Sequence, residues 1–367
     1  MKVLFLSQGR KRRNLYTLLV TVLPARFRGW LKVVPSLYES RMTPWAKSCL
    51  IDLKVVRHGG HELFSPPASI KDWARSEMSY PTRYAYVIKQ GFVSLPRGRI
   101  CVAGRWVGES FGNLVNASCE VLFLKLFSWV ARLRGRIIRL PECEGGYVYC
   151  RCDGYFHFVL ESLVSLLYAL QMRPNACVVV REAEYRRTAY FRQYIELLRQ
   201  RGWIKDVRVV DADCIIAPEL AFAAYEPDSG LFCRSTVDLL REALLQKEDG
   251  RFGQRKIFLT RKGKRQFVNQ RELERLAMDN GYEVIDTDGM SVEEQIKLFG
   301  AAAKIIANHG AGLINLAYCK AGVSVTELFS PKWLNDCYFR LSTLGGLSYS
   351  CIIAGDEDGW GSVDFPK

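Results

Sequence analysis

A histidine and a glutamate four residues apart, His157 and Glu161, could together form a general base. They lie in the stretch CDGYFHFVLES, and its apolar pattern predicts a helix over residues 155–171. Side chains four apart share a helix face, so the carboxylate can fix the imidazole tautomer and raise its basicity. Asp153, before this helix, is a candidate N-cap. A buried histidine satisfied by its helix neighbour fits the same pattern, and which of the three residues is the base stays open.

A second feature is the stretch IIANHGAGLINLAY (residues 305–318), where an apolar run ends in a loop with almost no side chains. The loop residues are His309, Gly310, Ala311 and Gly312. A helix is predicted to begin there, and a helix N-terminus offers unpaired N–H groups and partial positive charge to a diphosphate. Tight helix–strand packing would also need small residues, and the pattern is neither GxGxxG nor a Walker loop.

Basic side chains crowd the end of another predicted strand, residues 256–260. They are Arg261, Lys262, Lys264 and Arg265. Four cations could neutralise a nucleotide diphosphate without a metal, although a solvated basic loop has the same composition. Glu327, near the end of a third predicted strand, could accept both hydroxyls of a ribose or be an exposed edge glutamate. Together with the glycine loop, these features indicate a nucleotide-sugar site.

The elements that must position these residues follow one another regularly from residue 147 onward. Strands are predicted at 147–150, 176–180, 206–210, 214–224, 256–260, 282–286, 304–307, 324–329 and 347–353. Helices are predicted at 155–171, 184–201, 235–247, 270–280, 291–300, 312–319 and 336–345. Ser291 with Glu294 forms a capping box at the start of one of them. Short apolar strands that alternate with helices are typical of parallel sheets covered on both faces.

We therefore expect an α/β protein with two Rossmann-like domains whose parallel sheets face each other across a cleft. The predicted division gives an acceptor-side domain (1–232), a nucleotide-sugar domain (233–353) and a tail (354–367). The glycine-containing linker EDGRFGQR lies close to the domain break. In such sheets ligands bind beyond the carboxyl ends of the strands, which is where the bare loop and the cations are predicted.

Charge is distributed unevenly along the 367 residues. Residues 1–140 carry a net charge of +17, whereas residues 141–367 carry −3. The basic third is therefore expected to meet an anionic partner: nucleic acid, an anionic membrane surface or a phosphate-bearing substrate. The hydrophobic fraction of 49% is ample for large cores and argues against disorder.

Two apolar segments in this third bear on membrane contact. Residues 15–25 follow a basic cluster as in a signal peptide, but they are fewer than the roughly 20 residues that span a bilayer. Because residues 1–6 already predict a strand, we expect a buried strand and helix here. Residues 119–139 predict an apolar helix with interspersed basic residues, either a core helix with solvated ends or an interfacial helix on anionic lipid. Twelve scattered cysteines indicate reduced thiols in a cytosolic protein.

Taken together, these residues resemble glycosyltransferase family 61 over roughly residues 100–350. The matching motifs are Gly154-Tyr155-Phe156-His157 with Glu161, Arg261 and Arg265 before Asn269 to Leu273, Glu294-Gln295-Ile296, His309 to Leu313 with Asn315, and Glu327-Leu328. Family members usually have asparagine where Gly154 stands and glutamate where Gln270 stands. These two departures bear on donor geometry and sugar choice.

The resemblance implies an inverting, metal-independent transferase of the GT-B type that uses a UDP-sugar and needs no cofactor. The expected donor-binding residues are Arg261, Arg265, Asn269, Gln295, His309, Gly310, Ala311, Gly312, Asn315 and Glu327. The acceptor would be a hydroxyl of a glycan or lipid-linked glycan in surface-polysaccharide (capsule) biosynthesis. Like bacterial members, the protein is expected to be cytoplasmic, at the inner face of the cell membrane, which residues 1–140 would contact.

Two other classes compete with an active transferase. The sequence pI of about 9.2 suits a nucleic-acid-binding protein. The sequence lacks interleaved aromatic and basic motifs, however, and we expect no nucleic-acid partner. A catalytically inactive relative that still binds a nucleotide sugar is the second alternative, and the intact pair of His157 and Glu161 favours an active enzyme.

Overall fold

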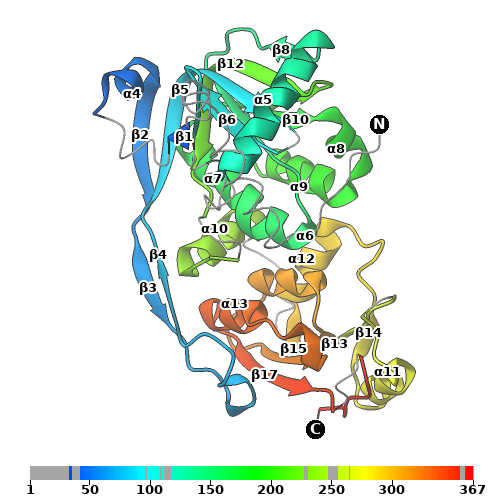
Figure 1. Ribbon diagram of the computed structural model, residues 1–367. Helices are drawn as coiled ribbons and strands as arrows, with labels where there is room; N and C mark the ends of the chain where they lie inside the picture. The colour runs from blue at the N-terminus through cyan, green and yellow to red at the C-terminus, as the bar shows by residue number, and fades with distance from the viewer. Residues whose placement is uncertain are drawn as a thin grey trace.

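The computed structural model describes residues 33–34, 42–95, 97–107, 110, 117–226, 230–246, 255–263, 265–355 and 360–366. The strand predicted at 1–6, the apolar run at 15–25 and Lys264 lie outside these ranges. Two large sheets with their helices form two units, drawn one above the other in Figure 1.

The second unit contains a five-stranded parallel sheet in the order β14-β13-β15-β16-β17. Its strands are β13 (Arg255–Leu259), β14 (Glu283–Ile285), β15 (Ala302–Asn308), β16 (Ser324–Phe329) and β17 (Ser348–Ile353). Its helices are α11 (Gln270–Asp279), α12 (Val292–Gly300), the 3-10 helix η6 (Ala311–Tyr318), the 3-10 turn η7 (Pro331–Trp333) and α13 (Cys337–Gly345). The order makes β13 and β15 neighbours, although the chain leaves them toward opposite edges of the sheet. A doubly wound sheet binds its ligands at such a switch point.

Local signals explain why the strands and helices of this unit lie close to the predicted positions. Ser291 Oγ accepts the N–H of Glu294, and Glu294 Oε2 accepts the N–H of Ser291 at 2.7 Å. This is the predicted capping box at the start of α12. The last four residues of β15 are all buried, as expected for a strand covered on both faces.

The first unit contains a ten-stranded mixed sheet, in the order β1-β7-β6-β5-β12-β9-β10-β11, with β2 beside β5 and β8 beside β12. Its strands are β1 (Val33–Val34), β2 (Leu50–Arg57), β5 (Arg83–Ser94), β6 (Arg99–Val102), β7 (Arg105–Val107), β8 (Ile137–Arg139), β9 (Tyr147–Tyr149), β10 (Cys177–Arg181), β11 (Asp206–Val210) and β12 (Cys214–Ala223). The parallel sheet expected here is correct for β9 to β12 and wrong for β5, which is antiparallel to β2, β6 and β12. No helix separates β5 from β6 or β7, and strands joined by short turns pair antiparallel.

The helices of the first unit differ from the prediction in two places. They are α4 (Pro44–Cys49), the 3-10 turn η2 (Ala68–Ile70), α5 (Ala117–Leu133), α6 (Tyr155–His157), the π-helical segment η5 (Phe158–Ser162), α7 (Leu163–Met172), α8 (Glu182–Arg187), α9 (Ala189–Gln200) and α10 (Arg234–Leu244). The helix predicted at 119–139 stops at Leu133, because Gly135 turns the backbone with φ of 62° into β8. The helix predicted at 184–201 is interrupted by Thr188, whose backbone is extended.

One continuous helix, Tyr155–Met172, is the single described segment whose length and composition would suit a membrane span. Two-thirds of it is buried inside the protein. Leu163, Leu167 and Ala169 have no exposed surface at all, so the helix belongs to the core.

A hairpin of β3 (Gly60–Leu63) and β4 (Glu77–Tyr80) leaves the first sheet and runs alongside the second unit (Figure 1). We call residues 60–80 the arm. Trp73 of the arm packs edge-on against Phe329 with ring centroids 5.6 Å apart. The arm therefore brings residues from the first fifth of the chain against the carboxyl ends of the second sheet.

Direct contacts also join the two units. The hydroxyls of Tyr194 and Tyr318 are 2.8 Å apart and buried. Arg340 donates to the carbonyl of Gly230 at 2.9 Å, and the N–H of Val292 donates to Gln193 Oε1 at 2.9 Å. One apolar core runs through both units, so the second sheet is held in place relative to the first.

A buried charge cluster stabilises the antiparallel part of the first sheet. Arg57, at the end of β2, contacts both oxygens of Glu226, with one of the distances 3.2 Å. Arg83, at the start of β5, lies 3.4 Å from the same carboxylate. All three side chains are at most 4% exposed.

We expect Glu226→Gln to reduce the free energy of unfolding by about 3–5 kcal/mol, because two buried guanidinium groups would lose their counter-charge. Urea denaturation measures this. Glu283→Gln is the matched control, since its ion pair with Arg255 is half exposed and is expected to contribute less than about 1 kcal/mol. Equal losses of unfolding free energy for the two variants would show that the buried cluster contributes no more to stability than the exposed ion pair.

Candidate active site

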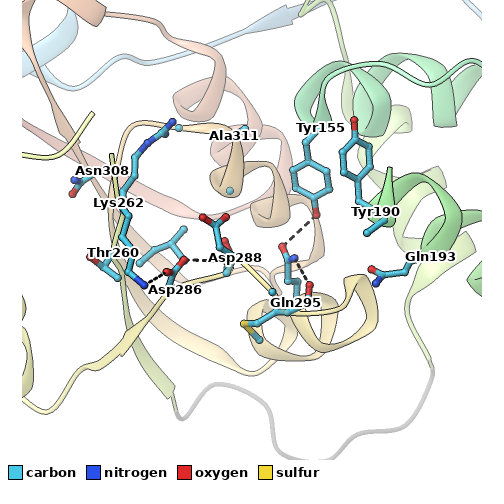
Figure 2. Close-up of a pocket in the computed structure, with 18 residues that line it drawn as sticks. Tyr155, Tyr190, Gln193, Thr260, Lys262, Asp286, Asp288, Gln295, Asn308 and Ala311 are labelled. Carbon is cyan, nitrogen blue, oxygen red and sulfur yellow. Dashed lines mark hydrogen bonds and ion pairs between the residues drawn. The ribbon is translucent and has the colours of Figure 1, made fainter. Parts of the chain in front are cut away.

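One pocket, named the first pocket, lies at the switch point of the second sheet. It has a volume of about 450 Å³, within the range of small-molecule sites. Its walls on one side follow the carboxyl ends of β13, β14 and β15. Tyr155, Tyr190 and Gln193 of the first unit face it from the other side (Figure 2).

Arg261 explains why the loop after β15 has no side chain at residue 310. A Cβ atom on Gly310 would lie only 1.7 Å from Arg261 Nη1. The same nitrogen donates to the carbonyl of His309 at 3.1 Å. Burial, together with the nearby charge of Arg265, lowers the pKa of Arg261. Residue 310 is therefore a glycine because a guanidinium packs against its backbone. Gly312 has a different neighbour, since a Cβ there would lie 3.3 Å from Leu259 of β13.

His309 is held by a buried carboxylate. Its Nδ1 is 2.5 Å from Glu327 Oε1, and the hydroxyl of Tyr349 donates to Glu327 Oε2 at 2.6 Å. Glu327 is fully buried, and burial raises its pKa. Both carboxylate oxygens already have partners, so this placement does not fit the ribose contact expected for Glu327. The carboxylate orients His309, whose ring also stacks on Phe329.

His157 and Glu161 form the pair that the sequence predicts. His157 Nδ1 is 2.9 Å from Glu161 Oε1, which also accepts the N–H of Gly230 at 3.2 Å. The hydrogen bond with Glu161 raises the pKa of His157. The histidine is half exposed and its partner is largely buried. Their helix widens to π geometry over Phe158–Ser162, a distortion that often marks functional sites.

The second pocket, of about 580 Å³, brings the two histidines together. His157 and His309 both line it, as does Arg265, whose guanidinium lies over the ring of Trp333 at 4.5 Å. Trp73 and Arg75 of the arm complete one wall. Residues from six separate parts of the sequence therefore surround one space.

Gly310 and Ala311 line both pockets, so the bare loop is their common wall. Two predicted residues hold this loop from behind. Asn315 donates to the carbonyl of Gly312 at 3.1 Å and to Gln295 Oε1 at 2.8 Å. Tyr155 donates to Asn315 Oδ1 at 3.0 Å, which links the helix of His157 to the loop.

Asp153 and Asn269 are two of the predicted site residues that lie elsewhere. Gly154, not Asp153, occupies the N-cap position, and Asp153 accepts hydrogen bonds from Arg151 at 2.6 Å and Ser162 at 2.5 Å. Asn269 exchanges two hydrogen bonds with the backbone of Val363, at 2.9 and 3.2 Å, and so fastens the C-terminal segment. Neither residue lines either pocket.

Asp286 and Asn308 are among the polar residues of the first pocket that the sequence motifs do not include. Asp286, just beyond β14, pairs with Lys262 at 2.8 Å, and this hydrogen bond lowers its pKa. Its position as an acidic residue at a strand end is a signal that could have identified Asp286, since such groups commonly bind ribose hydroxyls. Asn308 donates to Gln270 at 2.8 Å, but its buried Oδ1 has no hydrogen-bond partner among the described residues. A ligand N–H or O–H would satisfy this acceptor.

Positive charge at the loop comes from Arg261, Lys262 and Arg265. Within the described ranges, no three His, Cys, Asp or Glu side chains gather as a metal site would require. The cysteines whose side chains are described are free thiols.

The model of the glycosyltransferase 61 family matches residues 155–326. The match starts at Tyr155, in the helix of His157, and ends in β16, just before Glu327. It includes the bare loop and Arg261. Residues 155–326 therefore form a glycosyltransferase family 61 domain, which supports membership of this family and a glycosyltransferase enzyme. No curated protein sequence matches the chain.

We expect Gly310→Ala to displace the Arg261 side chain and reduce kcat/KM at least tenfold, with little change in melting temperature. The guanidinium is the flexible end of a side chain, so it can move without unfolding the protein, but it then leaves the loop. Steady-state kinetics and thermal unfolding check this. Gly355→Ala, where a Cβ meets no atom of the described residues within 4 Å, is the control. Full activity of Gly310→Ala would show that the site does not need Arg261 at this position.

Proposed function

We propose that this glycosyltransferase moves a sugar from a UDP-sugar to a hydroxyl of a glycan or lipid-linked glycan, with inversion and without a metal, in surface-polysaccharide biosynthesis. The observation that carries the proposal is the bare loop shared by two pockets. A donor whose diphosphate lies on that loop would place its nucleoside in one pocket and its sugar in the other.

The first pocket suits the nucleoside. Asp286 stands at a strand end, where a carboxylate can accept ribose hydroxyls, and takes over the role expected of Glu327. The unpartnered Oδ1 of Asn308 offers an acceptor, and the rings of Tyr155 and Tyr190 offer aromatic surface. Their ring centroids are 5.1 Å apart.

The loop and its cations suit the diphosphate. The N–H groups of Ala311 and Gly312 stand at the start of η6, where the helix has no side-chain cap. Anions bind at such termini through backbone N–H groups and the partial positive charge. Arg261 and Arg265 approach the loop from the two pockets and would stabilise the UDP that leaves.

The chemistry belongs to the second pocket. His157 accepts the proton of the acceptor hydroxyl, whose oxygen attacks the anomeric carbon. The bond from that carbon to the phosphate oxygen breaks in the same displacement, and UDP departs with the electron pair. Glu161 holds the imidazole tautomer and stabilises the imidazolium that forms. His309, the first residue of the loop, is fixed by Glu327, lines the same pocket and positions the donor.

The direct test incubates the purified chain with UDP-, GDP-, CMP- and ADP-sugars, with and without EDTA, and follows nucleotide release. The proposal predicts turnover of a UDP-sugar that EDTA leaves unchanged, and a product whose anomeric configuration, read by NMR, is inverted. Retention of configuration would refute inversion, and loss of activity in EDTA would refute metal independence. Turnover of another nucleotide sugar alone would refute the UDP-sugar donor.

We expect Glu161→Gln to shift the acid limb of the pH profile of kcat/KM to lower pH. A general base works in its neutral form, so activity rises as the pH passes the pKa of His157. The hydrogen bond with Glu161 raises that pKa, and its removal lets the pKa fall toward its ordinary value. The rate plateau should also fall, because the ring loses its orientation.

His157→Ala should lower kcat by about 10²–10⁴-fold, the usual contribution of a general base. Asp153→Asn serves as the comparison, since the Asp153 carboxylate is held by Arg151 and Ser162. An unchanged pH profile for Glu161→Gln, or near-normal activity for His157→Ala, would move the base assignment away from this pair.

A further inference from the structure

Helix α5 exposes large apolar side chains to solvent. Phe123, Leu126, Trp129 and Leu133 are 64%, 58%, 59% and 67% exposed. Exposed apolar residues that occur singly are normal on a protein surface, but a group of large ones marks an interaction site.

These four side chains form one stripe along the helix. At 100° per residue their spacing places them within about a third of the helix circumference. Leu124 and Ala131, from the opposite side of the helix, are buried against the protein. Figure 1 places α5 across the outside of the first unit. The stripe is therefore a second apolar face, turned away from the core that the first face packs against.

Basic residues flank the stripe. The stretch from Phe123 to Arg134 contains Lys125, Arg132 and Arg134 and no acidic residue. Arg132 and Arg134 are exposed, and neither has an ion-pair partner in the described part of the chain. Arg136 is different, because Asp211 and Asp213 already neutralise it.

We propose that this stripe, with Arg132 and Arg134, docks the protein on the surface of an anionic lipid bilayer. A helix with an exposed apolar face, a tryptophan within it and cations at its border lies in the interfacial plane of a membrane. The sequence of this segment fits both a core helix and an interfacial helix. The exposure of the stripe favours the interfacial one.

The combination of apolar and basic residues on this surface argues against nucleic acid or a second copy of the chain as its partner. Nucleic acid would use the cations but leave the apolar stripe in water. A second copy, paired through the same surface about a twofold axis, would bring Arg132 and Arg134 near their own equivalents. An anionic bilayer satisfies both the apolar stripe and the cations. The inference does not depend on the identity of the donor sugar.

The test is sedimentation of the full chain with vesicles of phosphatidylcholine alone or mixed with phosphatidylglycerol, at low and high salt. We expect binding only to the mixed vesicles, weakened by salt. Arg132→Gln with Arg134→Gln should weaken binding about tenfold or more, from roughly a fivefold effect per charge. Leu126→Ser with Trp129→Ser should abolish binding even at low salt.

Matched controls are taken from the second unit. Met278→Ser removes an apolar side chain that is 59% exposed on α11, and Arg271→Gln with Lys304→Gln removes two exposed charges. These controls should bind as the unaltered protein does. Hydrolysis of the donor in solution should be the same in all variants, which separates membrane docking from the proposed catalysis. Hydrogen exchange should slow over residues 123–134 when anionic vesicles are added.

Three outcomes would overturn the proposal. One is no binding to anionic vesicles, and another is equal binding by the Leu126 and Trp129 double variant. The third is a dimer of the unaltered protein that this double variant converts to a monomer, since the stripe would then be an interface between copies.

Discussion

The guanidinium of Arg261 occupies the space that any side chain at residue 310 would need, and the arrangement of the site depends on this packing. Arg261 follows β13 and Gly310 follows β15, and these strands are neighbours at the switch point of the second sheet. Parallel pairing brings their ends together, so the cation meets bare backbone. Asn315 holds the loop from behind. Because Gly310 has no side chain, it leaves room for Arg261 and keeps the loop thin enough to form a wall of both pockets.

Each pocket then receives its own polar groups from the surrounding elements. The first has Asp286 and the unpartnered oxygen of Asn308, which suit a nucleoside. The second has two imidazoles, each fixed by a glutamate from its own unit of the fold. The units share a core, so the two histidines face one space without a large domain movement. The proposed division into donor binding and base catalysis follows from this placement.

Local patterns predict much of this fold, and long-range pairing accounts for most of what they miss. Ser291 caps its helix, and the strands of the second sheet lie where their apolar runs indicate, because these features depend on nearby residues. The pairing of β5 with β12 joins segments more than a hundred residues apart, and the spacing of neither strand encodes it. The same limit applies to the site. The sequence predicts a glutamate at a strand end at position 327. It does not predict that the hydroxyl of Tyr349, from the neighbouring strand, hydrogen-bonds to this glutamate.

The claim that the loop binds a nucleotide diphosphate is tested most directly by thermal unfolding with UDP, UMP or uridine, each with EDTA present. A ligand that binds only the folded protein raises its melting temperature. We expect a clear rise in melting temperature with UDP, a smaller one with UMP and almost none with uridine, because Arg261 and the loop N–H groups bind the phosphates. Equal shifts with uridine and UDP, or no shift without added metal, would contradict that claim.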